Sequence, residues 1–384
     1  MNVIIGADAV RYPLTGIGRY AFELGSRLPA VPGIASVRYF RGGGVRDSLP
    51  ARPAAGRKEQ ASMRLRRMAI NMPLVVAAYS RFAAAAQKRS LREFRDYVYH
   101  GPNYYLPLHS GPCVATFHDL SVFLWPECHP AARVRYMNKE LRLAIQRAAV
   151  LVTDSEFNRQ EVAAYFNWPL DKIVVAPLAA AAEFRPMAAA AVAPVISSWA
   201  LTYGAYALFV GTLDPRKNVD GLLDAYERLP HALRIRMPLV VAGFEGWKSE
   251  HTIARLRTAE RDGWARYIGF VDEAALPALY AGARVFVYPS RYEGFGLPVL
   301  EAMAAGVPVI CSDAASLPEV TGGSDGARLV AAEDGDTLYA ALLQALEDDP
   351  WCANAGARGL ARAQHFSWDK TVSATVAAYR LAAQ

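Results

Sequence analysis

The sequence predicts an α/β protein of two domains, each built on a parallel sheet with helices on both faces. The 384 residues exceed the size at which one hydrophobic core usually divides, and the hydrophobic fraction of 53% is enough for two cores. Short apolar, β-rich runs alternate with helical patterns through the N-terminal half. A second series of the same alternation begins near Tyr206.

Six short apolar runs mark the strands that we expect in the first domain, residues 1–185. In a parallel sheet of this kind, ligands bind at the carboxyl ends of the strands. The expected strands are residues 2–7, 36–40, 97–100, 113–117, 150–153 and 173–176.

An alanine-rich linker, residues 177–194, leads to the second domain, residues 195–365. A terminal helix within residues 366–384 is expected to begin after Ser367, a good N-cap residue. The strands expected in the second domain begin at Tyr206 and continue with residues 239–242, 267–270, 285–288 and 307–311.

The loop after the first strand contains Gly16, Gly18 and Ala21, which match the G-x-G-x-x-A pattern of dinucleotide-binding domains. Two features argue against a dehydrogenase. The loop is too long for the tight turn of that fingerprint, and no acid follows the second strand, which continues as Arg41-Gly-Gly-Gly. An ordinary glycine turn is the alternative.

Residues 285–312 read as strand, glycine-rich loop, helix and strand, an arrangement that suits an anion. Pro298 fits the first turn of a helix and Gly306 the left-handed position after its end. The unpaired N–H groups at such a helix start attract phosphate. Gly294 and Gly296 allow the backbone to approach a ligand closely.

Two carboxylates, Glu293 and Glu301, flank this turn and are suited to accept hydrogen bonds from hydroxyl groups. Phosphate at a helix start beside such carboxylates describes a sugar nucleotide. In the alternative interpretation, Glu301 only complements the helix dipole and Glu293 is a solvated loop residue.

Charged side chains also follow strands in both halves of the chain. Arg216 and Lys217 come after a strand and a glycine, and a guanidinium beside an ammonium suits a diphosphate. The alternative is a charged surface turn. His118 and Asp119 follow the strand 113–117, where a site is expected, although a structural His–Asp pair is the alternative.

The stretch E-G-F-G-L-P-V-L-E, from Glu293 to Glu301, resembles the E-x7-E signature of retaining glycosyltransferase family 4. The resemblance implies the GT-B fold, in which two Rossmann-like domains face each other across a cleft and the last helix crosses back to the first domain. It implies that His118 contacts the donor sugar, with Asp119 supporting it by hydrogen bonding. The donor-binding residues that it implies are Gly16, Arg216, Lys217, Phe270, Val271, Glu293, Gly294, Phe295, Gly296, Leu297 and Glu301, with His118, Glu293, Arg216 and Lys217 also assigned to catalysis.

The resemblance further implies transfer of a hexose from a nucleotide diphosphate sugar to a lipid-linked glycan in bacterial surface polysaccharide synthesis. The stretch ending at Glu127 resembles relatives that use GDP-mannose-like donors. No cofactor or metal is expected, because Asp334-Gly-Asp336 reads as a helix cap. The alternatives are a silent nucleotide-sugar-binding module and a GT-B epimerase or phosphorylase, which would need further carboxylates or a cofactor lysine.

The charge distribution suggests an anionic membrane surface as a partner. Residues 1–195 hold 25 Lys and Arg against 14 Asp and Glu, whereas residues 196–384 hold 17 against 22. Residues 57–95 hold ten basic and two acidic side chains, of which Arg81, Lys88, Arg92 and Arg95 have the spacing of one helix face, with Val75, Tyr79 and Phe82 on another. A solvated outer helix is the alternative.

The remaining features predict a cytoplasmic protein bound peripherally to the inner membrane. The four cysteines lie far apart, which suggests a reducing compartment, and the start of the chain reads as a strand and not as a signal peptide. No apolar run has the length of a spanning helix, and no nucleic-acid motif is present. The sequence leaves the oligomeric state open.

Overall fold

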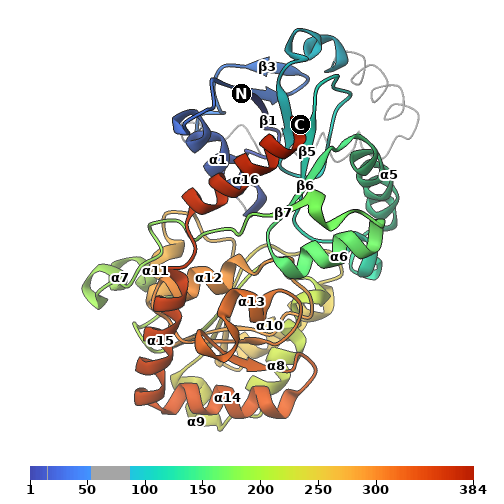
Figure 1. Cartoon of the computed structure of the whole chain (residues 1–384). Coiled ribbons are helices and arrows are strands. Elements are labelled where there is room, and N and C mark those ends of the chain that lie inside the picture. The colour runs from blue at the N-terminus through green and yellow to red at the C-terminus, as the bar shows by residue number, and fades with distance from the viewer. Residues whose placement is uncertain (15, 53–86) are drawn as a thin grey trace.

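The computed structural model describes residues 1–14, 16–52 and 87–384, which form two lobes, each with its own sheet (Figure 1). In these residues the first sheet has seven strands in the order β3-β2-β1-β4-β5-β6-β7. Its strands are β1 (Asn2–Gly6), β2 (Ser36–Arg41), β3 (Gly44–Arg46), β4 (Val98–Gly101), β5 (Cys113–Phe117), β6 (Val150–Thr153) and β7 (Ile173–Val175).

The second sheet has six strands in the described residues, in the order β10-β9-β8-β11-β12-β13. Its strands are β8 (Ala207–Val210), β9 (Leu239–Ala242), β10 (Ala265–Gly269), β11 (Val285–Tyr288), β12 (Val309–Ser312) and β13 (Arg328–Val330). Both sheets are parallel apart from β3, which pairs antiparallel with β2. The two-domain α/β fold that the sequence predicts is confirmed.

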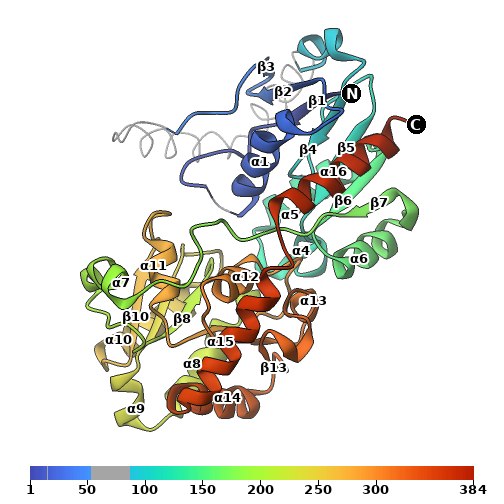
Figure 2. The same ribbon diagram turned by 60° about the vertical axis from the view of Figure 1, so that its left-hand side comes forward.

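Helices cover both faces of each sheet (Figure 2). The helices of the first part of the chain are α1 (Gly16–Arg27), α4 (Ser121–Leu124), α5 (Ala131–Arg147), α6 (Glu156–Phe166) and α7 (Ala189–Ile196). Those of the second lobe are α8 (Val219–Glu227), α9 (His231–Arg236), α10 (Glu250–Arg261), α11 (Leu276–Ala281), α12 (Leu297–Ala304), α13 (Leu317–Thr321), α14 (Gly335–Glu347) and α15 (Asp349–Ala363).

The period-2 alternation of β1 shows how each sheet is buried on both sides. Val3 and Ile5 pack in the core that contains α1, while Ile4 between them packs in the core that contains α5 and α6. Each sheet reverses its strand order between two central strands, β1 and β4 or β8 and β11. Ligands of doubly wound sheets bind outside the carboxyl ends of the strands at this point.

The last helix, α16 (Trp368–Ala382), lies against the first sheet although α15 before it belongs to the second lobe (Figures 1 and 2). Ser367 caps it by accepting a hydrogen bond from the N–H of Lys370. Against the first domain, the hydroxyl of Tyr379 is hydrogen-bonded to Nδ1 of the buried His100, at a distance of 2.7 Å.

Three local predictions differ from the structure. The segment 177–194 is not all linker, because α7 begins at Ala189 and includes Pro194. The strands β3 and β13, of three residues each, were not predicted. Arg92 lies in a 3-10 helix of residues 92–94 followed by Arg95 in a turn, so these two do not continue one long α-helix. Lys88 lies in residues 87–90, which are helical. Val75, Tyr79, Arg81 and Phe82, also expected in that helix, lie outside the described residues.

Several contacts join the lobes on both sides of the cleft. Arg19 of α1 pairs with Glu273 of the second lobe. The carboxylate of Glu319 on α13 accepts hydrogen bonds from the N–H groups of Glu156 (2.8 Å) and Phe157 (3.0 Å), which are unpaired donors at the start of α6. The two domains therefore lie in a closed arrangement.

Candidate functional site

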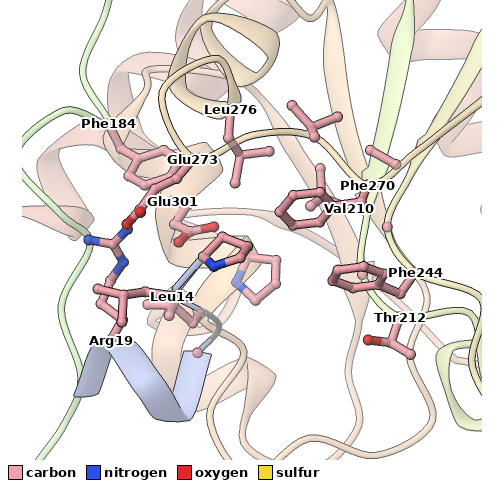
Figure 3. Close-up of a pocket in the computed structure, with 18 residues that line it drawn as sticks. Leu14, Arg19, Phe184, Val210, Thr212, Phe244, Phe270, Glu273, Leu276 and Glu301 are labelled. Atoms are coloured by element: carbon pink, nitrogen blue, oxygen red, sulfur yellow. The ribbon is translucent and has the colours of Figure 1, made fainter. Parts of the chain in front are cut away.

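A pocket of about 230 Å³ lies between the lobes, at the carboxyl ends of the central strands. Figure 3 shows its wall, to which α1 and the loop before it contribute from the first domain. The lining residues are Pro13, Leu14, Gly16, Arg19, Phe184, Val210, Gly211, Thr212, Ala242, Gly243, Phe244, Phe270, Val271, Glu273, Leu276, Leu297, Pro298 and Glu301. Of the predicted donor-binding residues, this set includes Gly16, Phe270, Val271, Leu297 and Glu301.

Two helices begin at this pocket. Gly16 is the first residue of α1, and Leu297 is the first residue of α12, with Pro298 in its first turn. Neither first turn contains an acidic residue. The partial positive charge and unpaired N–H groups of both helix starts therefore face one space, which suits a group with two phosphates.

Glu301 brings a carboxylate into the pocket from the second turn of α12 (Figure 3). Its Oε2 accepts a hydrogen bond of 3.1 Å from the hydroxyl of Tyr280. Burial raises the pKa of Glu301 to about 7, against the weaker opposing effects of Tyr280 and Arg19. Oε1 accepts no hydrogen bond from the described residues, and it can accept one from a ligand hydroxyl.

The far end of the pocket is aromatic. Phe270 stacks on Phe244 with ring centroids 4.5 Å apart and an interplanar angle of 18°. Both rings are close to half exposed, at 43% and 48%, although they are large apolar side chains. Val271 lies beside them in the pocket wall. A flat, apolar surface of this kind suits a nucleobase.

Arg216 and Lys217 do not line this pocket; both are buried in contacts with the loop that precedes α12. Lys217 Nζ lies 2.5 Å from Oε1 of Glu293 and 2.9 Å from the hydroxyl of Tyr288. Burial opposes ionisation of Glu293, but Lys217 and Arg216 outweigh it and lower the pKa of that carboxyl. The interpretation of Glu293 as a solvated loop residue is therefore wrong.

Arg216 stands between the two domains. Its Nη1 donates to the carbonyl of Tyr292 (3.1 Å) and lies 3.7 Å from Oδ2 of Asp119, a first-domain residue. Burial disfavours the cation, but Glu293, Asp119 and Asp214 raise the pKa of Arg216, so it stays charged. Its Nε is buried without a hydrogen-bond partner in the described structure, so the guanidinium keeps a donor for a ligand.

His118 is buried, and both of its ring nitrogens already have partners. Nδ1 lies 2.7 Å from Oδ2 of Asp154, and Nε2 donates to the carbonyl of Pro102 at 2.8 Å. Asp119 instead accepts bonds from the N–H and hydroxyl of Ser121. The expectation that Asp119 supports His118 is wrong, because Asp154 at the end of the neighbouring strand does so. The contact of His118 with a donor sugar stays a prediction.

The glycines of the loop before α12 are required by close approach. A Cβ on Gly294 would lie 1.6 Å from the carbonyl oxygen of His118, across the domain interface. Gly296 has a φ of +101° and caps α12. Phe295 is buried against Phe366, with ring centroids 5.8 Å apart, and is absent from the pocket wall. Its predicted contact with the donor is not made through this pocket.

The functional side chains that were not predicted include Arg19, Phe244, Glu273 and Asp154. Arg19 lies one turn after Gly16 in the same glycine motif, and its ion pair with Glu273 closes one side of the pocket (Figure 3). Phe244 and Asp154 each follow a buried strand, which is the position that indicated His118.

Comparison with known proteins identifies the family. Residues 202–362 match the family described as "Glycosyl transferases group 1". The chain is 44% identical over 382 residues to the O-antigen chain mannosyltransferase B of Escherichia coli, covering 99% of this chain and 100% of that protein. It is also 33% identical over 267 residues to the serotype-specific mannosyltransferase WbdA of Escherichia coli, and it spans about a third of that longer protein (32%).

Solved structures share the fold over nearly the whole chain. Sucrose-phosphate synthase from Thermosynechococcus elongatus superimposes with a TM-score of 0.71 at 20% identity, covering 99% of this chain and 98% of that one. WaaG, a glycosyltransferase involved in lipopolysaccharide biosynthesis, superimposes with a TM-score of 0.69 at 16% identity, covering 99% of both chains.

Proposed function

The chain belongs to the glycosyl transferases group 1 family, and we propose that it is a retaining, family 4 enzyme that transfers mannose from GDP-mannose to a lipid-linked glycan. One observation carries the donor assignment: the starts of α1 and α12 converge on a pocket that also holds Glu301 and the Phe244–Phe270 pair. Phosphates at the helix starts, ribose hydroxyls on Glu301 and a base against the aromatic pair form one continuous ligand.

The proposed reaction breaks the bond between the sugar C1 and the diphosphate and forms a bond from C1 to an acceptor oxygen on the same face. The acceptor proton moves to a phosphate oxygen of the leaving nucleoside diphosphate. Arg216 and the helix starts stabilise the charge that grows on that group. Glu293 is held by Lys217 and orients sugar hydroxyls, a role that does not require it to act as a nucleophile.

The choice of sugar and pathway comes from the relatives. The full-length relative is named for mannosyl transfer to an O-antigen chain, and the match covers all of its length. We therefore assign the chain to the synthesis of a bacterial surface polysaccharide. No metal is part of the proposal, because Arg216, Lys217 and two helix starts supply the positive charge, and we expect transfer to continue in the presence of EDTA.

The place of action that we propose is the cytoplasmic face of the inner membrane. No helix in residues 1–14, 16–52 and 87–384 is long and apolar enough to cross a bilayer. The basic excess in residues 1–195 would attract the anionic leaflet, and this would hold the first domain near a lipid-linked acceptor.

A thermal-shift screen of the purified protein against nucleotide sugars, followed by detection of the released nucleoside diphosphate, tests the proposal. We expect GDP and GDP-mannose to raise the melting temperature, and GDP-mannose to be consumed. Stabilisation by GDP-mannose without any turnover, even with a mannoside acceptor, would favour a silent binding module. No stabilisation by any nucleotide sugar would refute the donor assignment.

A further inference from the structure

Outside the pocket, a second cluster of side chains joins the two domains. His129 follows a 3-10 turn of the first domain (Pro126–Cys128), and Trp247 lies in the second domain between β9 and α10. Their rings meet edge to face with centroids 6.0 Å apart. The guanidinium of Arg133, on α5, lies 4.6 Å from the centroid of the indole ring. No assignment of the donor site uses these residues.

His129 has hydrogen-bonding capacity that the described protein does not use. Both of its ring nitrogens are buried, and neither has a partner in residues 1–14, 16–52 or 87–384. Buried polar atoms without partners are costly and uncommon in native proteins. A ligand that bonds to the ring would remove this cost.

The ring is suited to hydroxyl groups in particular. Burial lowers the pKa of His129, and the cations of Arg133 and Arg216 lower it further. A neutral imidazole has one N–H donor and one acceptor nitrogen. A sugar presents hydroxyls that can donate to one nitrogen and accept from the other, whereas an anion could use only the donor.

Trp247 is an exposed indole that the backbone holds in place. The side chain is 45% exposed although Arg133 lies over it. A Cβ on Gly243 would lie 1.9 Å from the carbonyl oxygen of Gly211, and one on Gly246 would lie 2.0 Å from that of Leu213. The segment that carries Trp247 is thus packed against the segment that leads to Arg216. A fixed, amphipathic ring of this kind suits the apolar face of a pyranose.

The cluster adjoins the reaction centre of the proposed function. Arg216 lies close enough to Cys128 and His129 for its charge to lower the pKa of both side chains. Asp119, whose Oδ2 lies 3.7 Å from Arg216 Nη1, is also near enough to act on the pKa of His129. A sugar bound at His129 would therefore stand beside the residues assigned to the leaving phosphate, where the attacking hydroxyl is needed.

We infer that His129 and Trp247 form the subsite for the terminal pyranose of the acceptor, with hydroxyls on the His129 ring and the sugar's apolar face on Trp247. The inference rests on the proposed transfer reaction, because only that reaction brings a second sugar to this side of the cleft.

The test measures acceptor and donor kinetics with octyl α-glycosides of mannose, glucose, galactose and N-acetylglucosamine. In the His129→Leu and Trp247→Ala variants we expect the acceptor KM to rise about tenfold or more, as for the loss of one or two hydrogen bonds or of a stacked ring. The KM for GDP-mannose and its slow hydrolysis without acceptor should stay within about twofold of wild type. Trp247→Phe should recover part of the affinity, and His251→Ala, which removes an exposed histidine of α10, is the matched control.

An unchanged acceptor KM in both variants, or an equal rise in donor KM, would overturn the subsite. If the wild-type protein hydrolyses GDP-mannose but accepts none of the glycosides, the pyranose subsite is wrong while the donor assignment stands. If no nucleotide sugar binds or reacts at all, the proposed function fails instead.

Discussion

Lys217 and Glu293 form a buried ion pair that contributes to the stability of the fold and to the geometry of the candidate site. Both side chains are about 10% exposed and their charged atoms are 2.5 Å apart. Removal of one partner leaves a buried charge without its counter-ion, which costs more than the pair itself contributes. A variant at either position is therefore expected to change stability and, under the proposed function, ligand binding as well.

The pair can be tested by a double-mutant cycle. We expect Lys217→Met to lower the free energy of unfolding by about 3 kcal/mol, because Glu293 then stays buried and charged. Glu293→Gln should cost less, since its amide oxygen can still accept from Lys217. In the double variant, a coupling of about 1–3 kcal/mol should be measured by urea unfolding. Strictly additive effects would show that the two side chains do not interact.

Glu301 makes the stability of the fold depend on pH. Burial raises its pKa in the folded protein from 4.5 to about 7. Between pH 4.5 and pH 7, the folded state therefore keeps a proton that the unfolded state has lost. Stability from this group is present below pH 4.5 and is lost as the pH rises to 7. In Glu301→Gln this loss is absent, so the variant should gain about 3 kcal/mol on wild type between pH 4.5 and pH 8.

Melting temperatures of wild type and Glu301→Gln across that range check this prediction. Tyr280→Phe is a useful control, because it removes the hydrogen bond to Glu301 and keeps the titrating carboxyl. Parallel curves for wild type and Glu301→Gln would mean that Glu301 titrates at its ordinary pKa.

At the residue scale, the sequence predicted a position correctly where all the residues concerned lie in one short motif. Glu301 and Pro298 share a helix with its glycine-rich start, so their position in the pocket follows from local geometry. The partner of His118 could not be assigned in this way. Asp154 is 36 residues away, and which acid faces the ring depends on how β5 and β6 pair, so the adjacent Asp119 was chosen wrongly.

At the scale of elements, the loop between β11 and α12 connects the proposed donor site to the opposite domain. Its backbone touches the first domain at two places: Gly294 packs against the carbonyl of His118, and the Gly294 carbonyl accepts a bond of 2.6 Å from Ser155. Ser155 also caps α6 by accepting from the N–H of Asn158. The same loop thus joins the proposed donor site to the opposite domain.

Gly294→Ala should prevent this closure. The new Cβ would meet the backbone oxygen of His118 at 1.6 Å, whereas the φ of Gly294 is not in the positive range, so the local backbone accepts alanine. We expect a larger radius of gyration by small-angle scattering and loss of transfer activity. Gly335→Ala is the control, because its Cβ would only reach Arg228 at 3.9 Å. Unchanged scattering and turnover in Gly294→Ala would contradict the closed arrangement.

The prediction of elements was accurate for strands of four or five apolar residues. It was weak for the three-residue strand β3 and for a helix without separate polar and apolar faces. The strands β5, β6, β9 and β11 have the bounds that their sequences predict. The strand β3 has three residues and exists because it pairs with β2. Helix α7 was missed because its alanines have no polar face and Pro194 lies inside it.

At the scale of the whole molecule, the sequence predicts the fold and its charge asymmetry, but not the contacts between the lobes. Arg19 and Glu273 are 254 positions apart, and nothing in either local sequence indicates their pairing. The proposed membrane surface also remains a prediction, because most of residues 57–95 lie outside the described structure.

Vesicle binding tests the membrane proposal. Each basic residue near an anionic surface contributes about 1 kcal/mol, an effect that salt screens. We expect the protein to co-sediment with anionic vesicles, to bind neutral ones weakly and to be released by salt. Reversal of Arg81, Lys88 and Arg92 to Glu should abolish binding. Reversal of Arg257, Arg261 and Arg358 in the second domain should change it little. Equal binding to neutral and anionic vesicles would refute the proposal.

The stereochemistry of transfer tests the central claim most directly. The protein is incubated with GDP-α-mannose and an octyl mannoside, and the configuration at the new anomeric carbon is read from its one-bond carbon–hydrogen coupling by NMR. A nucleophilic attack on the face that the diphosphate leaves predicts an α-mannoside, with GDP released in equal amount. A β-mannoside would contradict the retaining mechanism assigned to this cleft.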